Sequence, residues 1–139
     1  MKGIAPLALV LALVPLTGCV TTGAFNSANL TNVELSQDNY RVVATNVSGE
    51  AEATYLLGLS AAMGMEMQTF ALVRLSGNGM LYKAALDSLW RNFEARYGPV
   101  TDRALALVNV RYDSDALNVL GLFTRPRIGI RADVVEFNR

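Results

Sequence analysis

The sequence predicts an α+β fold: a mostly antiparallel sheet of about four strands, with one main amphipathic helix packed on one face. Three observations predict it. Residues 40–57 and 127–137 alternate apolar and polar side chains, as half-buried strands do. Residues 104–112 form a mainly apolar run, which is typical of a strand buried on both faces. Between residues 82 and 97, apolar side chains recur at steps of three and four, as on a helix with one apolar stripe.

The first alternating segment changes parity along its length. Its apolar residues are even-numbered in residues 40–44 and odd-numbered in residues 51–57. Because a shift by one residue exchanges the two faces of a strand, we expect a bulge or turn within residues 46–50, with Gly49 as the pivot. Upstream, residues 33–35 could pair as a further short strand.

The helix predicted over residues 82–97 is the clearest element in the chain. Its apolar stripe consists of Tyr82, Leu86, Leu89, Phe93 and Tyr97, and Ala85 and Trp90 widen it. Asn78 could cap its start, because a short polar side chain can accept a hydrogen bond from the first free backbone N–H groups. Gly98 followed by Pro99 should end it, since proline cannot continue a helix.

Residues 59–75 fit two periods at once. Met63, Met65 and Met67 alternate as in a strand, whereas Met63, Met67 and Phe70 lie at helical spacing. We expect a loop that leads into a short helix. Three methionines could bind a soft metal such as Cu(I), but methionine more often fills irregular core space, and we prefer that interpretation.

The composition excludes several classes of active site. The chain has no histidine and one cysteine, so it cannot form a Ser-His-Asp triad, an imidazole metal site, an internal disulfide or a thiolate cluster. Its formal net charge of zero argues against a nucleic-acid partner. Hydrophobic residues make up 52% and charged residues 17%, which predicts one domain with a real core. We expect no enzyme activity and no cofactor.

The N-terminus resembles the leader of a bacterial lipoprotein. Lys2 precedes an apolar stretch over residues 3–14, which is too short to span a bilayer. The sequence Leu16-Thr17-Gly18-Cys19 then has the form of a lipobox, which is cut before the cysteine. We predict a signal peptide over residues 1–18 and lipid attachment at Cys19. The alternative is an incidental cysteine beside an ordinary cleavage site.

Cleavage there divides the chain into three parts. Residues 19–32, which are polar and lack apolar periodicity, form the acylated N-terminus and a tether, and residues 33–139 form the single α+β domain. Several acyl chains make release from a membrane very slow. Val20 follows the cysteine, which under enterobacterial sorting rules predicts the outer membrane, facing the periplasm.

Three short blocks carry a family resemblance, namely residues 51–58, 106–110 and 132–137, with the sequences AEATYLLG, ALVNV and ADVVEF. They resemble a family of small uncharacterised bacterial lipoproteins, a domain of unknown function, and the similarity spans residues 23–137. More remotely, the order strand, helix, strand, strand is similar to the tRNA-locus-like lipoproteins and to small ring-forming α+β domains. The resemblance implies this fold and an envelope location, without an activity, substrate or cofactor. The methionine-rich stretch departs from the family's shorter glycine-rich loops.

Few polar residues stand out as candidate sites. Paired carboxylates are the only candidate acid–base machinery, and we expect the three pairs at solvated positions: Glu50 with Glu52, Asp113 with Asp115 and Asp133 with Glu136. Asn109 interrupts an aliphatic strand, so we expect it to be buried and to tie a neighbouring loop. Asp133 could pair with Arg131 or Arg111 across strands.

We expect residues 113–126 to form a connection between two strands, and it is unusually apolar. Its apolar residues could fold back over the sheet end, or they could contact a protein partner, a second copy or the lipid headgroups; they are Leu117, Val119, Leu120, Leu122 and Phe123.

From these features we predict a non-enzymatic interaction or scaffold module anchored in the envelope, with self-association through a sheet edge and the loop from Leu117 to Phe123 as an option. The alternatives are a binding protein with a ligand pocket between helix and sheet, or a hydrolase with two carboxyls about 5 to 9.5 Å apart.

Overall fold

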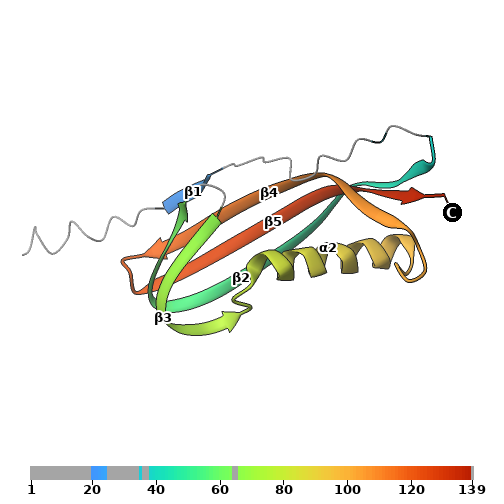
Figure 1. Cartoon of the computed structure of the whole chain (residues 1–139). Helices are drawn as coiled ribbons and strands as arrows, with labels where there is room; N and C mark the ends of the chain where they lie inside the picture. The colour runs from blue at the N-terminus through green and yellow to red at the C-terminus, as the bar shows by residue number, and fades with distance from the viewer. Residues whose placement is uncertain (1–19, 25–34, 36–37, 64–65, 139) are drawn as a thin grey trace, which may run out of the picture.

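The computed structural model describes residues 20–24, 35, 38–63 and 66–138. The strands are β1 (Val20–Ala24), β2 (Tyr40–Met63), β3 (Glu66–Gly77), β4 (Leu105–Val119) and β5 (Phe123–Phe137), and the helix is α2 (Leu81–Tyr97). All pairings are antiparallel, and the sheet order is β1-β4-β5-β2-β3. Figure 1 shows α2 lying along one face of the sheet. The predicted α+β fold is confirmed, with four long strands and the short β1 at one edge.

The helix packs through a narrow row of residues at steps of four, namely Leu81, Ala85, Leu89 and Phe93. The predicted stripe was therefore centred too far round the helix, because Tyr82 and Tyr97 are largely exposed. The predicted end is confirmed: Gly98 has φ 84° and its N–H donates to Glu94 O at 3.0 Å. Asn78 does not cap the helix, since it accepts from the N–H of Met80, just before the first turn.

Gly49 allows the helix to approach β2, and it is not the pivot of the parity change. A Cβ atom at Gly49 would lie 2.2 Å from both Ala85 O and Leu89 N, so no larger residue fits there. The register shifts instead lie earlier, between Val42 and Val47. The sequence pattern showed that a shift exists, but the glycine marked a different constraint.

The expectation of a loop and short helix over residues 59–75 is wrong, because β2 continues to Met63 and β3 pairs along it. The deciding pattern is a period of two in which Leu57 and Leu59 alternate with Gly58 and Ser60. Met63 and Met67 belong to these strands, but the side chains of residues 62–67 lie outside the described part.

The expected long connection over residues 113–126 is also wrong. β4 runs on to Val119 and β5 begins at Phe123, so only residues 120–122 form the turn. Leu120 and Gly121 have φ values of 51° and 69°, and Leu122 N–H donates to Val119 O at 2.9 Å. Gly121 is the turn signal, whereas Pro126 lies within the strand.

The N-terminal predictions are only partly within the described residues. Residues 1–19 and 25–34, which include the predicted signal peptide and Cys19, lie outside them. Val20–Ala24, within the segment expected to be a tether, is strand β1 and pairs with β4. Of the possible strand at residues 33–35, only Leu35 is described, and it belongs to no strand.

Candidate functional site

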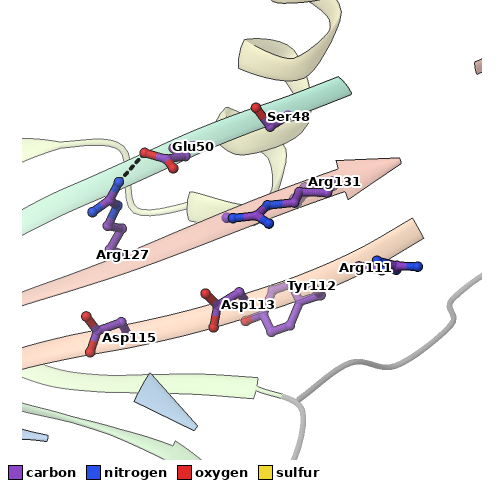
Figure 2. Close-up of a pocket in the computed structure, with 10 residues that line it drawn as sticks. Ser48, Glu50, Arg111, Tyr112, Asp113, Asp115, Arg127 and Arg131 are labelled. Atoms are coloured by element: carbon purple, nitrogen blue, oxygen red, sulfur yellow. Dashed lines mark hydrogen bonds and ion pairs between the residues drawn. The ribbon is translucent and has the colours of Figure 1, made fainter. Parts of the chain in front are cut away.

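The face of the sheet opposite the helix carries charged side chains from three strands and a hollow of about 310 Å³. Arg131 lies opposite Ser48 and Arg111 in the register, and the next row places Gly129 between Glu50 and Asp113. Figure 2 shows that Arg131 extends along β5 into this hollow, whereas Arg111 points the other way. Glycine in the central row has no side chain to fill the space between Glu50 and Asp113, so the floor of the hollow is open.

Some of the described charged side chains in the hollow form ion pairs and others do not. Glu50 forms an ion pair with Arg127. The hydrogen bond and charge of Glu50, helped by Glu52 and Asp115, raise the pKa of Arg127. Within the described part of the chain, Arg131 and Asp113 form no ion pair closer than 4 Å. The hollow therefore offers charges of both signs to a solute.

Two of the predicted carboxylates, Asp133 and Glu136, are stabilised in the charged form by their hydrogen-bond partners. The side chains of Arg103 and Arg41 lower the pKa of Glu136 to about 2. Hydrogen bonds from Asn109 and Asn46 lower the pKa of Asp133. Among the described residues, no group of three His, Cys, Asp or Glu side chains could hold a metal ion.

Glu136 joins the helix end to the sheet through Arg103. Arg103 donates to both of its oxygens at 2.9 and 3.0 Å, and Arg41 donates to Oε2 at 2.7 Å. The Arg103 guanidinium also lies 5.5 Å from the Phe93 ring centre and donates to Tyr97 O. These contacts fix the C-terminal end of α2 on the sheet.

Asp133 and Asn109 form a second structural contact. The predicted burial of Asn109 is wrong: the residue is exposed and has φ 53° in a bulge of β4. Its Nδ2 donates to Asp133 Oδ2 at 2.8 Å. Asp133 thus binds an amide rather than forming an ion pair with Arg131 or Arg111, although the charge of Arg111 contributes to its lowered pKa.

The predicted interaction residues lie at the end of the β4–β5 hairpin. Leu117, Val119, Leu120 and Leu122 are 39% to 57% exposed. Phe123 is partly buried, with the Arg125 guanidinium 5.7 Å from its ring centre. Most of this apolar surface therefore does not fold back over the sheet.

Sequence reasoning missed the other half of this surface, which lies on the β2–β3 hairpin. Leu59 faces Phe70 in the register, and the neighbouring pairs place Leu57 opposite Leu72. These four side chains are 51% to 80% exposed. Their alternation with small and polar residues was the available signal. We call these four residues, together with Leu117, Val119, Leu120 and Leu122, the apolar end.

A polar cluster beneath the apolar end holds the two hairpins together. Asn118 accepts from Ser60 N–H at 2.9 Å through Oδ1 and donates to Ser60 O at 2.7 Å through Nδ2. The Thr124 hydroxyl lies 2.5 Å from Asn118 Oδ1, and Ser60 Oγ lies 2.8 Å from Thr69 Oγ1. The side chain of Asn118 thus pairs with a backbone as a neighbouring strand would.

The chain enters this end of the domain through β1. Val20 lies opposite Leu117 and Thr21 opposite Ala116 in the register. In Figure 1, β1, the β4–β5 turn and the β2–β3 hairpin lie at the same end of the molecule, opposite the C-terminus. Within the described residues, no helix is both long and apolar enough to cross a membrane.

Comparison with known proteins assigns the chain to one family. A family of unknown function, DUF6567, matches residues 1–139. The chain belongs to the DUF6567 family. No curated protein and no solved structure matches it. The family confirms the predicted domain of unknown function, and it carries no activity, ligand or partner that could be transferred to the residues above.

Proposed function

We propose that the protein is a lipoprotein of the cell envelope that acts by binding and not by catalysis. Acyl chains on Cys19 hold it in the outer membrane, and the folded body faces the periplasm as an interaction or scaffold module. The lipobox supports the anchor. We also propose that the protein is remotely similar to the tRNA-locus-like lipoproteins. The charged sheet face is then the surface that meets partners in the periplasm.

The observation that carries this proposal is the position of β1. Val20, which directly follows Cys19, pairs with Leu117 at the apolar end. A lipid anchor at that point would hold the body by its most hydrophobic end and leave the charged face open to solvent.

The test is mass spectrometry of the protein purified from cells. We expect acyl groups on Cys19 and an N-terminus at that residue, and membrane fractionation that is lost in Cys19→Ser. Thr22→Ser, which lies just outside the lipobox, is the matched control and should fractionate like the parent. A free thiol on the mature protein contradicts the anchor.

One observation favours a second candidate function, which is binding of a small ligand. The hollow over Gly129 presents the cation of Arg131 beside the carboxylate of Asp113, a pattern that suits a zwitterion such as a short peptide. It lies on the face opposite the helix, not between helix and sheet. Calorimetric titration with the dipeptide lysylglutamate tests it, and Gly129→Val, which fills the hollow, should abolish any heat of binding.

A further inference from the structure

The apolar end is unusual for a domain of this size. Leu72 and Phe70 are 80% and 74% exposed, and they lie beside other exposed leucines instead of being scattered singly. A contiguous apolar surface usually marks a contact with a partner or a membrane. The internal packing of the domain does not explain these side chains, because the buried polar cluster around Ser60 closes the hairpins beneath them.

Direct contacts make the two hairpins one surface. Leu57 N–H donates to Leu122 O at 2.8 Å, which joins β2 to the β4–β5 turn. A Cβ atom at Gly121 would lie 4.0 Å from Leu59 Cδ2, so the leucine side chain reaches the same turn. Residues far apart in the sequence thus form a continuous apolar area at one end of the molecule.

The charges around this area favour a lipid surface over another protein. Residues 55–77 and 116–126, which hold the two hairpins, contain three charged residues. Arg74 and Arg125 are basic and exposed, and Glu66 lies at the β2–β3 turn, opposite Met63 in the register. Arg125 lies opposite Leu117 in the register, at the border of the apolar end. Leucines and an aromatic ring bordered by arginines suit the boundary between acyl chains and anionic headgroups.

The position of β1 also favours a lipid surface, and this step rests on the proposed lipid anchor. Because Val20 pairs with Leu117, the residue that would carry the acyl chains lies one residue from the apolar end. One extended residue spans about 3.3 to 3.6 Å. An anchor this close keeps the apolar end next to the bilayer and gives it a high effective concentration there.

We infer that the apolar end inserts into the headgroup region of the membrane beside the anchor. Leu57, Leu59, Phe70 and Leu72 then contact lipid from one hairpin, and the β4–β5 turn contacts it from the other. The helix and the C-terminal end of β5 point away from the bilayer. The protein is therefore held in a fixed orientation by two contacts and does not swing on a flexible tether.

Tryptophan fluorescence tests the insertion, because the chain has a single tryptophan, Trp90, on α2. The reporter is the double variant Phe70→Trp, Trp90→Phe, and the parent protein with Trp90 is the matched control. Both are studied as lipidated proteins in vesicles of phosphatidylethanolamine and phosphatidylglycerol that contain brominated acyl chains. We expect a blue shift and strong quenching at position 70 and no quenching at position 90. Equal, weak quenching at both positions overturns the inference.

Three further arms separate the explanations. Adding Leu59→Asp to the reporter should abolish the quenching, and because Leu59 is exposed, circular dichroism should remain unchanged. Diluting the protein among excess vesicles should leave the quenching unaltered; loss on dilution would mean that a second copy covers the apolar end. If Cys19 proves unacylated, the same reporter can be coupled through that thiol to a maleimide lipid, so that insertion is tested apart from the natural anchor.

Discussion

Asp133 accepts a hydrogen bond from Asn109 Nδ2 at 2.8 Å, and its other oxygen accepts one from the backbone N–H of Asn46 at 2.8 Å. Both asparagines have φ above 50° and lie in bulges of β4 and β2, the two neighbours of β5. One carboxylate therefore holds two irregular positions from the strand between them. The left-handed backbone conformation explains why asparagine occupies both sites, since it tolerates that region better than most residues.

Removal of this contact should weaken the fold. Asn109→Ala should lower the free energy of unfolding by about 1 kcal/mol, because it removes a hydrogen bond to a charged group and places alanine at positive φ. Urea denaturation followed by circular dichroism measures the change. Asn109→Gly is the control, because glycine also lacks the hydrogen bond to Asp133 but adopts a positive φ without strain. An alanine variant more stable than the glycine variant would contradict the backbone argument.

The same carboxylate makes stability depend on acidity. Its pKa is lowered in the folded state, so the stabilisation is present above the ordinary aspartate pKa and is lost as the pH falls through the folded value. We expect Asp133→Asn to flatten the acidic limb of the stability curve. Stability measured in a pH series for parent and variant tests this expectation, and parallel curves would speak against it.

Glu136, which lies on the same strand as Asp133, should dominate acid unfolding. Its pKa is about 2 in the folded protein against an ordinary value of 4.5, because it is bound by Arg103 and Arg41. The ion pairs therefore stabilise the fold above about pH 4.5 and lose their effect as the pH falls toward 2. In Glu136→Gln the free energy of unfolding should depend less on salt, and less on pH below about 4.5. NMR titration of the Glu136 side chain gives the folded pKa directly.

Gly49 and Gly129 offer a pair of identical substitutions with opposite outcomes. Gly49→Ala would place Cβ 2.2 Å from the helix backbone, so the helix must move, and we expect a loss of about 1 to 3 kcal/mol or more. Gly129→Ala meets nothing closer than 3.9 Å and should change stability little. Thermal or urea unfolding compares them. Equal effects would show that the helix does not rest on β2 as described.

Single charges at the apolar end should alter association without altering the fold. Leu120→Asp and Leu122→Asp replace exposed side chains, so we expect stability within about 0.5 kcal/mol of the parent. Light scattering in the absence of lipid tests the self-association that we predicted for this hairpin. A monomer in both parent and variants rules out self-association through these residues, and a parent oligomer that the variants dissolve supports it.

The fold was predictable wherever one physical constraint acted on a segment. Burial against a single partner produced the helical stripe near Leu89 and the alternation in β5, and both were recognised from the sequence. Segments under two constraints were misread. Gly49 has regular strand pairing but also lies under a helix, and Leu59 alternates as a strand residue although its apolar side chain faces outward.

The candidate sites were less predictable because they depend on register. The hollow requires Gly129 to lie between Glu50 and Asp113, and the contact between Asp133 and Asn46 spans 87 residues of sequence. Local patterns do not contain such pairings. The exposed leucines of the β4–β5 hairpin were found because their composition was unusual, whereas those on β2–β3 were taken for part of a loop and short helix.

The polar cluster around Ser60 has a consequence for biogenesis. Ser60 is joined to Asn118 and Thr124 across 58 and 64 residues of sequence, so the first hairpin cannot be secured until nearly the whole chain has been made. Until residues 118–124 are present, the backbone and the hydroxyl group of Ser60 lack these hydrogen-bond partners. A chain truncated before residue 118 should therefore lack the contacts that close the β2–β3 hairpin, which favours aggregation of the partly folded protein.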